Sequence, residues 1–280
     1  GGPTYTAVSN PNPGGDQIMV ALLYRADVVE ESGNAANLAT PTAVFQSNRV
    51  PLAQTFRAIE AGNPNLGQEV TVCVNHWKSK GGSCGAGDDD NGGAGSCNGT
   101  RDAAAQAIVT WLTGNPTGVN EPDQLIIGDL NAYSQEDPLL TLEAAGYLNT
   151  VRETSLPGSF PCGSTPSYVF RGEWGSLDHI FASGSLSTKV TGSTPWQVNA
   201  AEPTALDYDT QFNDPALYAA DFYRFSDHDP IIIGLDLGAT LPAELTALTG
   251  TQEGSRIALD WTTSVEVNTD RFVVERRATS

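Results

Sequence analysis

Positively charged residues are scarce in this sequence. Of its 280 residues, 14 are Lys or Arg against 33 Asp or Glu, which gives a formal net charge of −19. Proteins that bind nucleic acid tightly and passively usually carry a basic surface that releases counterions from the phosphates. The composition therefore argues against passive nucleic-acid binding. It does not argue against turnover of such a substrate with divalent cations, because the metal supplies the local positive charge.

Long apolar runs and a leader segment are also lacking. The longest apolar run, Pro230–Leu235, has the length of a buried strand and falls far short of the about 18 residues that indicate a membrane-spanning helix. No membrane association is therefore predicted. Met19 is the only methionine, and the first residues contain neither a basic nor an apolar leader region. We expect the natural start to lie upstream of Gly1. Because the sequence also ends abruptly, we expect the natural C-terminus to lie beyond Ser280.

The four cysteines form no metal-thiolate motif, because no two of them stand in a CxxC-like pair. Cys84 and Cys97 bracket a polar loop that has no hydrophobic means of holding itself together. We predict a disulfide between them, which indicates an oxidising compartment. Pairing between Cys73 and Cys162 is left open. The run 88–90 in the loop is interpreted as solvated surface, because the spacing of a calcium-binding EF-hand loop is absent.

Short apolar runs and two helical patterns indicate the fold class. Buried strands are predicted at 17–24, 53–59, 68–75, 124–128, 176–182 and 231–235, and residues 30–50 are predicted as loop. Thr100 is the predicted N-cap of an amphipathic helix, and Asp137-Pro138 opens a shorter one. Strands that are apolar on both faces and interleaved with helices predict an α/β layered sandwich. The composition changes at 238–242, where we place a linker between a main domain at 1–237 and a small β-domain at 243–280, with strands predicted at 257–261 and 272–275.

Polar residues gather where the predicted strands begin or end. The segments are Asn75–Lys80, Asp129–Asn131, Asp178–His179 and Ser226–Asp229, and they contain all three histidines of the chain. Singly, a histidine or an Asp-Leu-Asn turn is more often structural. Four such clusters at strand ends, where layered α/β proteins build their sites, favour a catalytic site.

These residue types suit the hydrolysis of a phosphodiester. Carboxylates hold Mg²⁺ through oxygen, and imidazole transfers protons near neutral pH. Cations neutralise the non-bridging phosphate oxygens, although each one singly is at least as often a solvated surface charge. The predicted phosphate-binding residues are Asn75, Lys78, Lys80, Arg49 and Arg101.

Five segments together resemble a known superfamily. They are 75–82, the Cys84–Cys97 loop with 100–106, 127–131, 175–180 and 225–231. Their content and order are similar to the endonuclease/exonuclease/phosphatase superfamily, and more narrowly to its secreted bacterial extracellular-nuclease branch. The resemblance runs from near residue 5 to 237 and implies the DNase I-like fold, a four-layer α/β sandwich.

The resemblance also implies roles for individual residues. His76 and His228 would engage the scissile phosphate or the attacking water, and Asp178 would orient His228 through a carboxylate–imidazole hydrogen bond. Asp129 and Asn131 would position the nucleophile and the phosphate.

The expected metal is Mg²⁺, with Ca²⁺ or Mn²⁺ as alternatives, held by Asp227 and Asp129. Asp16 would be an acidic partner near the first histidine. The family's early Asn and its metal-binding Glu in a Gln-Glu motif have no counterpart in this chain. We therefore expect the main domain to be N-terminally truncated and the chain by itself to be inactive or weak.

Residues 243–280 resemble a truncated fibronectin-III-like module, with a β-hairpin extension as the alternative. For the whole protein we predict a secreted or cell-surface bacterial phosphodiesterase that hydrolyses DNA, as a monomer without an obligate protein partner. Two alternatives remain. One is a lipid or inositol-phosphate phosphoesterase of the same fold, and the other is a non-catalytic surface-binding module.

Overall fold

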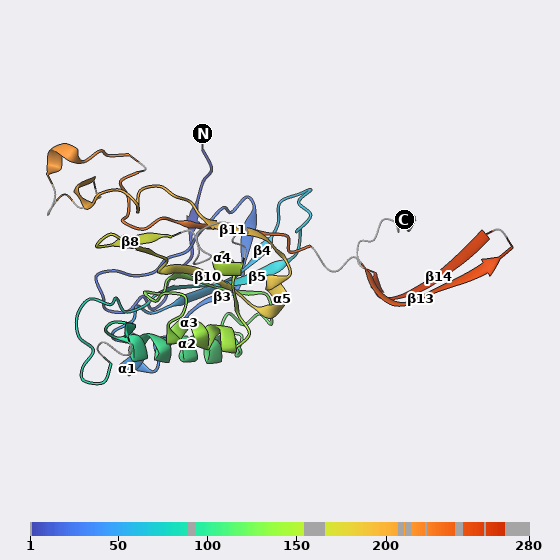
Figure 1. Ribbon diagram of the computed structural model, residues 1–280, viewed down its shortest axis with the longest axis horizontal. Coiled ribbons are helices and arrows are strands. Elements are labelled where there is room, and N and C mark those ends of the chain that lie inside the picture. The colour runs from blue at the N-terminus through green and yellow to red at the C-terminus, as the bar shows by residue number, and fades with distance from the viewer. Residues whose placement is uncertain are drawn as a thin grey trace. The chain divides into compact units, whose positions relative to one another are not determined.

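The computed structural model describes residues 2–88, 93–153, 166–206, 210, 214–221, 223–238, 243–254 and 256–266. The chain divides into two compact units, Gly1–Asp236 and Leu237–Ser280. Figure 1 shows the elements of both units. The helices are α1 (Thr42–Phe45), α2 (Asn98–Leu112), α3 (Asp137–Ala144), α4 (Thr150–Glu153) and α5 (Gly184–Ser187), with short 3₁₀ turns at Thr204–Leu206 and Pro215–Leu217.

A six-stranded mixed sheet organises the first unit. Its strand order is β3 (Val29–Asn37), β4 (Leu52–Ala58), β5 (Glu69–His76), β6 (Gln124–Asp129), β10 (Asp178–Ala182) and β7 (Leu148–Asn149). Only β5 and β6 are parallel within this order, and α2 provides the crossover that a parallel pair requires. Three two-stranded ribbons complete the unit: β1 (Thr6–Ala7) with β2 (Leu23–Tyr24), β8 (Tyr168–Phe170) with β9 (Glu173–Gly175), and β11 (Val190–Pro195) with β12 (Ile231–Leu235).

Both faces of the sheet are buried, because side chains alternate along each strand. On β4, Ala53 packs into a core that also contains Ile108 of α2 and Leu139 of α3, whereas Leu52 and Phe56 pack into a second core on the other face. Figure 1 shows α2 and α3 on one side of the sheet and β11 on the opposite side. This arrangement confirms the predicted α/β class.

Helix α2 begins three residues earlier than predicted, and a residue outside the helix caps it. Its N-cap position is Cys97, at a left-handed φ of 69°, and Cys97 provides no side-chain cap. The carboxylate of Asp88 instead accepts hydrogen bonds from the backbone N–H groups of Gly99 and Thr100 and from the Thr100 hydroxyl. The prediction of Thr100 as the N-cap is therefore wrong, and Asp88 is a capping residue rather than plain solvated surface.

Two other local predictions are wrong. In the predicted buried strand at 17–24, only Leu23 and Tyr24 form a strand, and Met19 and Leu23 are 56% and 66% exposed. Val20 and Leu22 point inward, so the apolar run is an edge segment with alternating burial. The predicted loop at 30–50 contains the polar strand β3 and the single-turn helix α1.

The second unit contains a long antiparallel hairpin, β13 (Ala243–Glu253) with β14 (Arg256–Glu266). The predicted strand at 257–261 falls within β14, whereas the predicted strand at 272–275 lies outside the described residues. None of the helices in the described ranges has the length and apolarity needed to span a membrane.

Candidate active site

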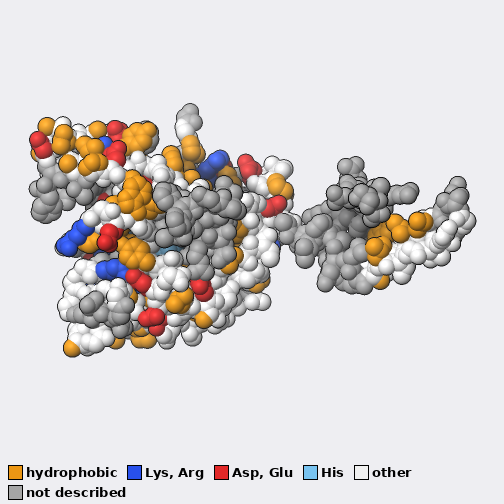
Figure 2. All heavy atoms as spheres, viewed as in Figure 1, with side chains coloured by type: hydrophobic (Ala, Val, Ile, Leu, Met, Phe, Trp, Pro, Cys, Tyr) orange, Lys and Arg blue, Asp and Glu red, His pale blue; other side chains and the backbone are white. Residues whose placement is uncertain are grey.

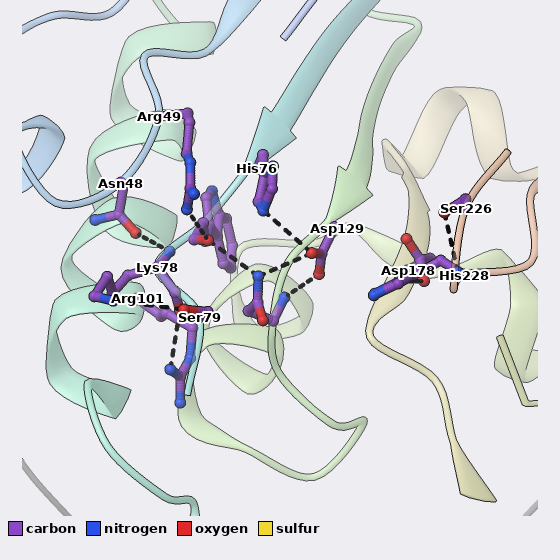
Figure 3. A network of polar contacts seen from close by, with 12 residues as sticks. Asn48, Arg49, His76, Lys78, Ser79, Arg101, Asp129, Asp178, Ser226 and His228 are labelled. Atoms are coloured by element: carbon purple, nitrogen blue, oxygen red, sulfur yellow. Dashed lines mark hydrogen bonds and ion pairs between the residues drawn. The ribbon is translucent and has the colours of Figure 1, made fainter. Parts of the chain in front are cut away.

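Three acidic and imidazole side chains form a row across neighbouring strands. His76 at the end of β5 is the register partner of Asp129 at the end of β6. Asp129 is in turn the register partner of Asp178 at the start of β10. Residues opposite one another on adjacent strands project to the same face, so the sheet itself brings these three side chains together. Figure 3 shows His76 facing Asp129, with Asp178 and His228 on the other side.

Asp129 is fixed on two sides. Its Oδ2 atom lies 3.3 Å from Nε2 of His76. Asn131, at a left-handed φ of 49°, donates its backbone N–H to Oδ1 and its side-chain amide to Oδ2, both at 2.9 Å. The strand just before Asp129 needs a glycine, because a Cβ on Gly128 would come within 2.0 Å of the Asn75 carbonyl oxygen.

Asp178 and His228 form a carboxylate–imidazole pair. Nδ1 of His228 lies 2.7 Å from Oδ2 of Asp178, which also accepts a 2.8 Å hydrogen bond from the Ser167 hydroxyl. The ring of Tyr168 stacks on the imidazole, with 4.4 Å between the ring centroids. With Nδ1 engaged, Nε2 is the nitrogen of His228 through which a proton can pass to another molecule.

The two site histidines are held in opposite protonation states. Burial lowers the pKa of His76 to about 4, and the positive charges of Arg49 and His228 add to the effect. Burial also lowers the pKa of His228, but the hydrogen bond and charge of Asp178, with the charges of Asp129 and Asp227, outweigh it and raise that pKa to about 9. At neutral pH, His76 is therefore neutral and His228 is protonated.

A divalent cation fits between these side chains. Asp129, Asp178 and His228 each offer one ligand atom, and the three atoms lie within 4.8 Å of one another. Burial and the neighbouring Asp178 charge raise the pKa of Asp129 to about 6, although the positive charges of His228 and Arg49 act in the opposite direction. Carboxylate oxygens are the ligands that Mg²⁺ and Ca²⁺ prefer. Asp227, the other predicted metal ligand, does not join this group of three ligand atoms.

Arg49 is the predicted cation that lies beside the row. Its backbone N–H donates to the His76 carbonyl at 3.1 Å, and its positive charge acts on both His76 and Asp129. Its Nε atom lies 3.3 Å from Oδ2 of Asp16, whose side chain is 52% exposed. Asp16 also acts electrostatically on His76, so the structure places this acidic residue near the first histidine.

The other predicted phosphate-binding residues lie where they hold the protein together. Arg101 is fully buried and donates to the backbone carbonyls of Lys78, Ser96 and Ala94. Lys80 is paired with Glu136, with its Nζ also 2.7 Å from the Ala94 carbonyl oxygen. These two cations thus anchor the loop after β5.

Asn75 and Lys78 also make local contacts. Asn75 is 2% exposed and donates to the Cys73 carbonyl oxygen, so it is not open to a substrate. The Lys78 ammonium group donates to the Gly81 carbonyl oxygen at 3.1 Å, and the Lys78 backbone N–H donates to Asn48. Lys80 and Arg101 share the carboxylate of Glu136, whereas Arg49 is paired with the exposed Asp16.

Several residues near the site have roles that sequence reasoning did not find. His179 is buried and bonded to Asn149 and to the Ala132 carbonyl oxygen, so it belongs to the core. Asp229 is 2% exposed, and its Oδ1 accepts the backbone N–H groups of three successive residues, Val198–Ala200. The sequence shows only that Asp229 stands between a histidine and a proline. It does not show that this carboxylate is buried or which backbone groups it binds.

The described cysteines are either disulfide-bonded or buried as a free thiol. Cys84 and Cys97 are joined by a disulfide in the structure. Cys73 is a buried free thiol, and Cys162 lies outside the described residues.

Nearly all of the first unit is similar to known proteins. A family model described as "Endonuclease/Exonuclease/phosphatase family" matches residues 2–228. A solved structure of a protein from that family in Bacteroides thetaiotaomicron is 15% identical, with a TM-score of 0.50 over 82% of this chain and 74% of that chain. A mannosyl-6-phosphatase from Bacteroides thetaiotaomicron VPI-5482 is 16% identical, with a TM-score of 0.50 over 83% and 76%. A Neisseria 3′ phosphatase bound to a product DNA hairpin is 14% identical, with a TM-score of 0.44 over 83% and 79%. No curated protein matches the sequence.

Proposed function

Because this chain belongs to the endonuclease/exonuclease/phosphatase family, we propose that it is a secreted, metal-dependent phosphodiesterase whose substrate is DNA. The observation that carries the proposal is the row of His76, Asp129 and Asp178 on three neighbouring strands, with His228 bonded to Asp178. Hydrolysis of a phosphodiester needs a group that delivers a proton and groups that position the phosphate and the water.

His228 is the proton donor in this proposal. Its pKa of about 9 keeps the imidazole protonated at neutral pH, and Asp178 fixes the ring through Nδ1. Nε2 then donates to a phosphate oxygen or to the leaving group. His76 stays neutral because its pKa is about 4, and it holds Oδ2 of Asp129 through Nε2. Asn131 prevents Asp129 from rotating away.

Asp129 and Asp178 are the proposed ligands of the cation. A protonated imidazole has no free lone pair for a metal, so His228 is better suited to the proton transfer than to metal binding. Asp227 stays a proposed additional ligand on the family resemblance alone. A bound divalent cation, proposed to be Mg²⁺, would stabilise the negative charge that develops on the phosphate.

Arg49 is the proposed contact to a non-bridging phosphate oxygen. Its partner Asp16 is 52% exposed, whereas the Arg49 side chain is 15% exposed, so a phosphate would replace a solvated carboxylate at a largely buried guanidinium. Lys78 is proposed to contact a neighbouring phosphate.

One feature supports an extracellular location, and another supports a nuclease over a lipid phosphoesterase. The Cys84–Cys97 disulfide suits an oxidising compartment. The segment 75–80 and the disulfide-closed loop behind it are the parts of the sequence that resemble secreted bacterial nucleases.

Plasmid cleavage in Mg²⁺, with and without EDTA, tests this function. Both this chain and the product of the complete gene are assayed, with His228→Ala and Asp129→Asn as site variants. Asp27→Asn serves as the matched control, because Asp27 is exposed and paired with Arg25 away from the row. In the product of the complete gene we expect metal-dependent cleavage that is lost in both site variants and kept in the control, whereas this chain by itself should cleave weakly or not at all. Hydrolysis of sphingomyelin in place of plasmid by the same preparation would contradict DNA as the substrate.

A further inference from the structure

A cleft opens beside the catalytic row. Its volume is about 730 Å³, within the about 300–1,000 Å³ that is typical of ligand sites. One wall is the β8–β9 hairpin, with Tyr168, Phe170 and Trp174, and the opposite wall is the segment 199–206. The cleft reaches the catalytic residues at Tyr168, whose ring stacks on His228, and at Asp227, the residue before His228. Figure 2 shows hydrophobic side chains gathered at the end of the molecule where β8 lies.

Both walls are anchored to the catalytic residues. Asp229 holds the far wall through the backbone N–H groups of Asn199 and Ala200, at 3.0 and 3.1 Å. The backbone N–H of Asp229 donates to the Ser167 carbonyl oxygen at 2.8 Å, and Ser167 precedes the hairpin. The Ser167 hydroxyl bonds Asp178. A ligand between the walls would therefore sit at a fixed distance from the Asp178–His228 pair.

The chemistry of the cleft favours a flat aromatic ligand. Phe170 and Trp174 are 49% and 57% exposed, so their rings are open to a stacking partner. Arg171 lies at the hairpin tip with a left-handed φ of 51°, a conformation that favours Asn or Gly. Its guanidinium lies 5.1 Å from the centroid of the Phe170 ring.

The charges of the cleft do not favour a phosphate there. Glu202 on the far wall is paired with Arg224 at 2.8 Å, and Asp227 lies at the end near His228. Among the described lining residues, Arg171 is the single cation. Stacking on rings, rather than ion pairing, would therefore supply most of the affinity.

We propose that this cleft binds an unstacked nucleobase next to the scissile phosphate, and that the enzyme therefore prefers single-stranded or frayed DNA. The inference rests on the proposed nuclease function and adds the form of the substrate. A base within an intact duplex is stacked and paired, so it reaches the cleft only at the cost of leaving the helix. A base in a single strand bears no pairing cost and can insert between the aromatic hairpin and the far wall.

Binding of labelled oligonucleotides to this chain tests the proposal without cleavage. Fluorescence anisotropy in Mg²⁺ compares a fluorescein-labelled octathymidylate with a labelled hairpin duplex, both with phosphorothioate backbones that resist hydrolysis. The variants are Trp174→Ala and Phe170→Ala, with Trp174→Phe as the rescue. Trp196→Ala is the matched control, because Trp196 is 56% exposed and is not among the cleft-lining residues. Far-UV circular dichroism shows whether each variant is folded.

We expect tighter binding of the single strand than of the duplex. Each alanine variant should weaken single-strand binding about 5- to 150-fold, the range expected for loss of one stacked base, whereas Trp174→Phe and Trp196→Ala should stay near wild type. Equal affinities for both DNA forms, or no loss in folded alanine variants, would overturn the proposal. So would Trp174-dependent binding of mannose 6-phosphate with none of oligonucleotide, which would assign the aromatic wall to a sugar. If the protein cleaves plasmid but the alanine variants bind the single strand as tightly as wild type, the nuclease function is retained and only the proposed base-binding role of the cleft is refuted.

Discussion

Replacing Asp178 with Asn tests the electrostatic basis of the site. The Asp178→Asn variant keeps a side chain of the same shape beside Nδ1 of His228 but removes its negative charge. In the native site, that charge and the 2.7 Å hydrogen bond outweigh the burial of His228 and raise the imidazole pKa to about 9. Without the charge, burial weighs more, and we expect the pKa of His228 to fall towards 6.5.

The size of the effect follows from the pKa values. A rise from the ordinary 6.5 to about 9 corresponds to about 3 kcal/mol in favour of the protonated, folded form. Because the folded-state pKa is raised, this contribution is fully present below pH 6.5 and is lost as the pH rises through about 9. The variant should therefore be less stable than wild type by up to about 3 kcal/mol at pH 6, because the charges of Asp129 and Asp227 keep part of the shift, and the difference should shrink above pH 9.

NMR titration and urea unfolding, both in EDTA, measure these quantities. The chain has three histidines, and burial lowers the pKa of both His76 and His179, so the resonance that titrates near pH 9 in wild type identifies His228. Catalysis should fall about 10²–10⁴-fold at pH 7.5, the usual contribution of a positioned proton donor. A His228 resonance that still titrates near pH 9 in the variant would refute the assignment of the shift to Asp178. A stability loss of equal size at pH 6 and pH 10 would refute it as well.

Three further predictions concern the loop after β5. Asp88→Ala should lower the free energy of unfolding by about 1 kcal/mol in urea denaturation, because α2 loses its cap; an unchanged midpoint would mean that another group caps the helix. Arg101→Met should cost about 2–4 kcal/mol in the same assay, because three backbone carbonyls lose a buried charged donor, and a loss under 1 kcal/mol would contradict its anchoring role. Reduction of the Cys84–Cys97 disulfide by dithiothreitol should destabilise the fold by about 3 kcal/mol, seen as a lower Tm, and an unchanged Tm would show that the loop does not depend on it.

The strands around the site were predictable from the sequence because they are buried on both faces. Strands β6 and β10 contain short continuous apolar runs, β5 alternates valine with threonine, cysteine and asparagine, and the ends of all three strands carry the polar clusters. Strand β3 was missed because it is a polar strand at the edge of the sheet, where Glu30 and Glu31 face water. The segment 17–24 was overpredicted for the converse reason, since apolar side chains such as Met19 remain exposed.

The sequence was enough to predict which residues form the candidate site, but only part of the role that each residue has. Residue type and strand position were enough to group His76, Asp129 and Asp178, which the register then places in one row. The sequence shows that Lys80 and Arg101 are charged but not that they are buried or paired. Burial depends on how distant segments pack, and a single sequence carries no direct signal of that packing.

The position of the row on β5, β6 and β10 limits which mutations the enzyme can tolerate during evolution. Pairing register sets the face to which each side chain projects, so deleting one residue within any of these strands would turn part of the row away from its partners. The aromatic hairpin and the opposite segment 199–206 lie outside these strands and tolerate changes in length and composition far better. Libraries that vary Arg171, Gly172 and 199–206 should therefore yield folded enzymes with altered substrate choice, whereas libraries in the three strands should yield mostly inactive ones.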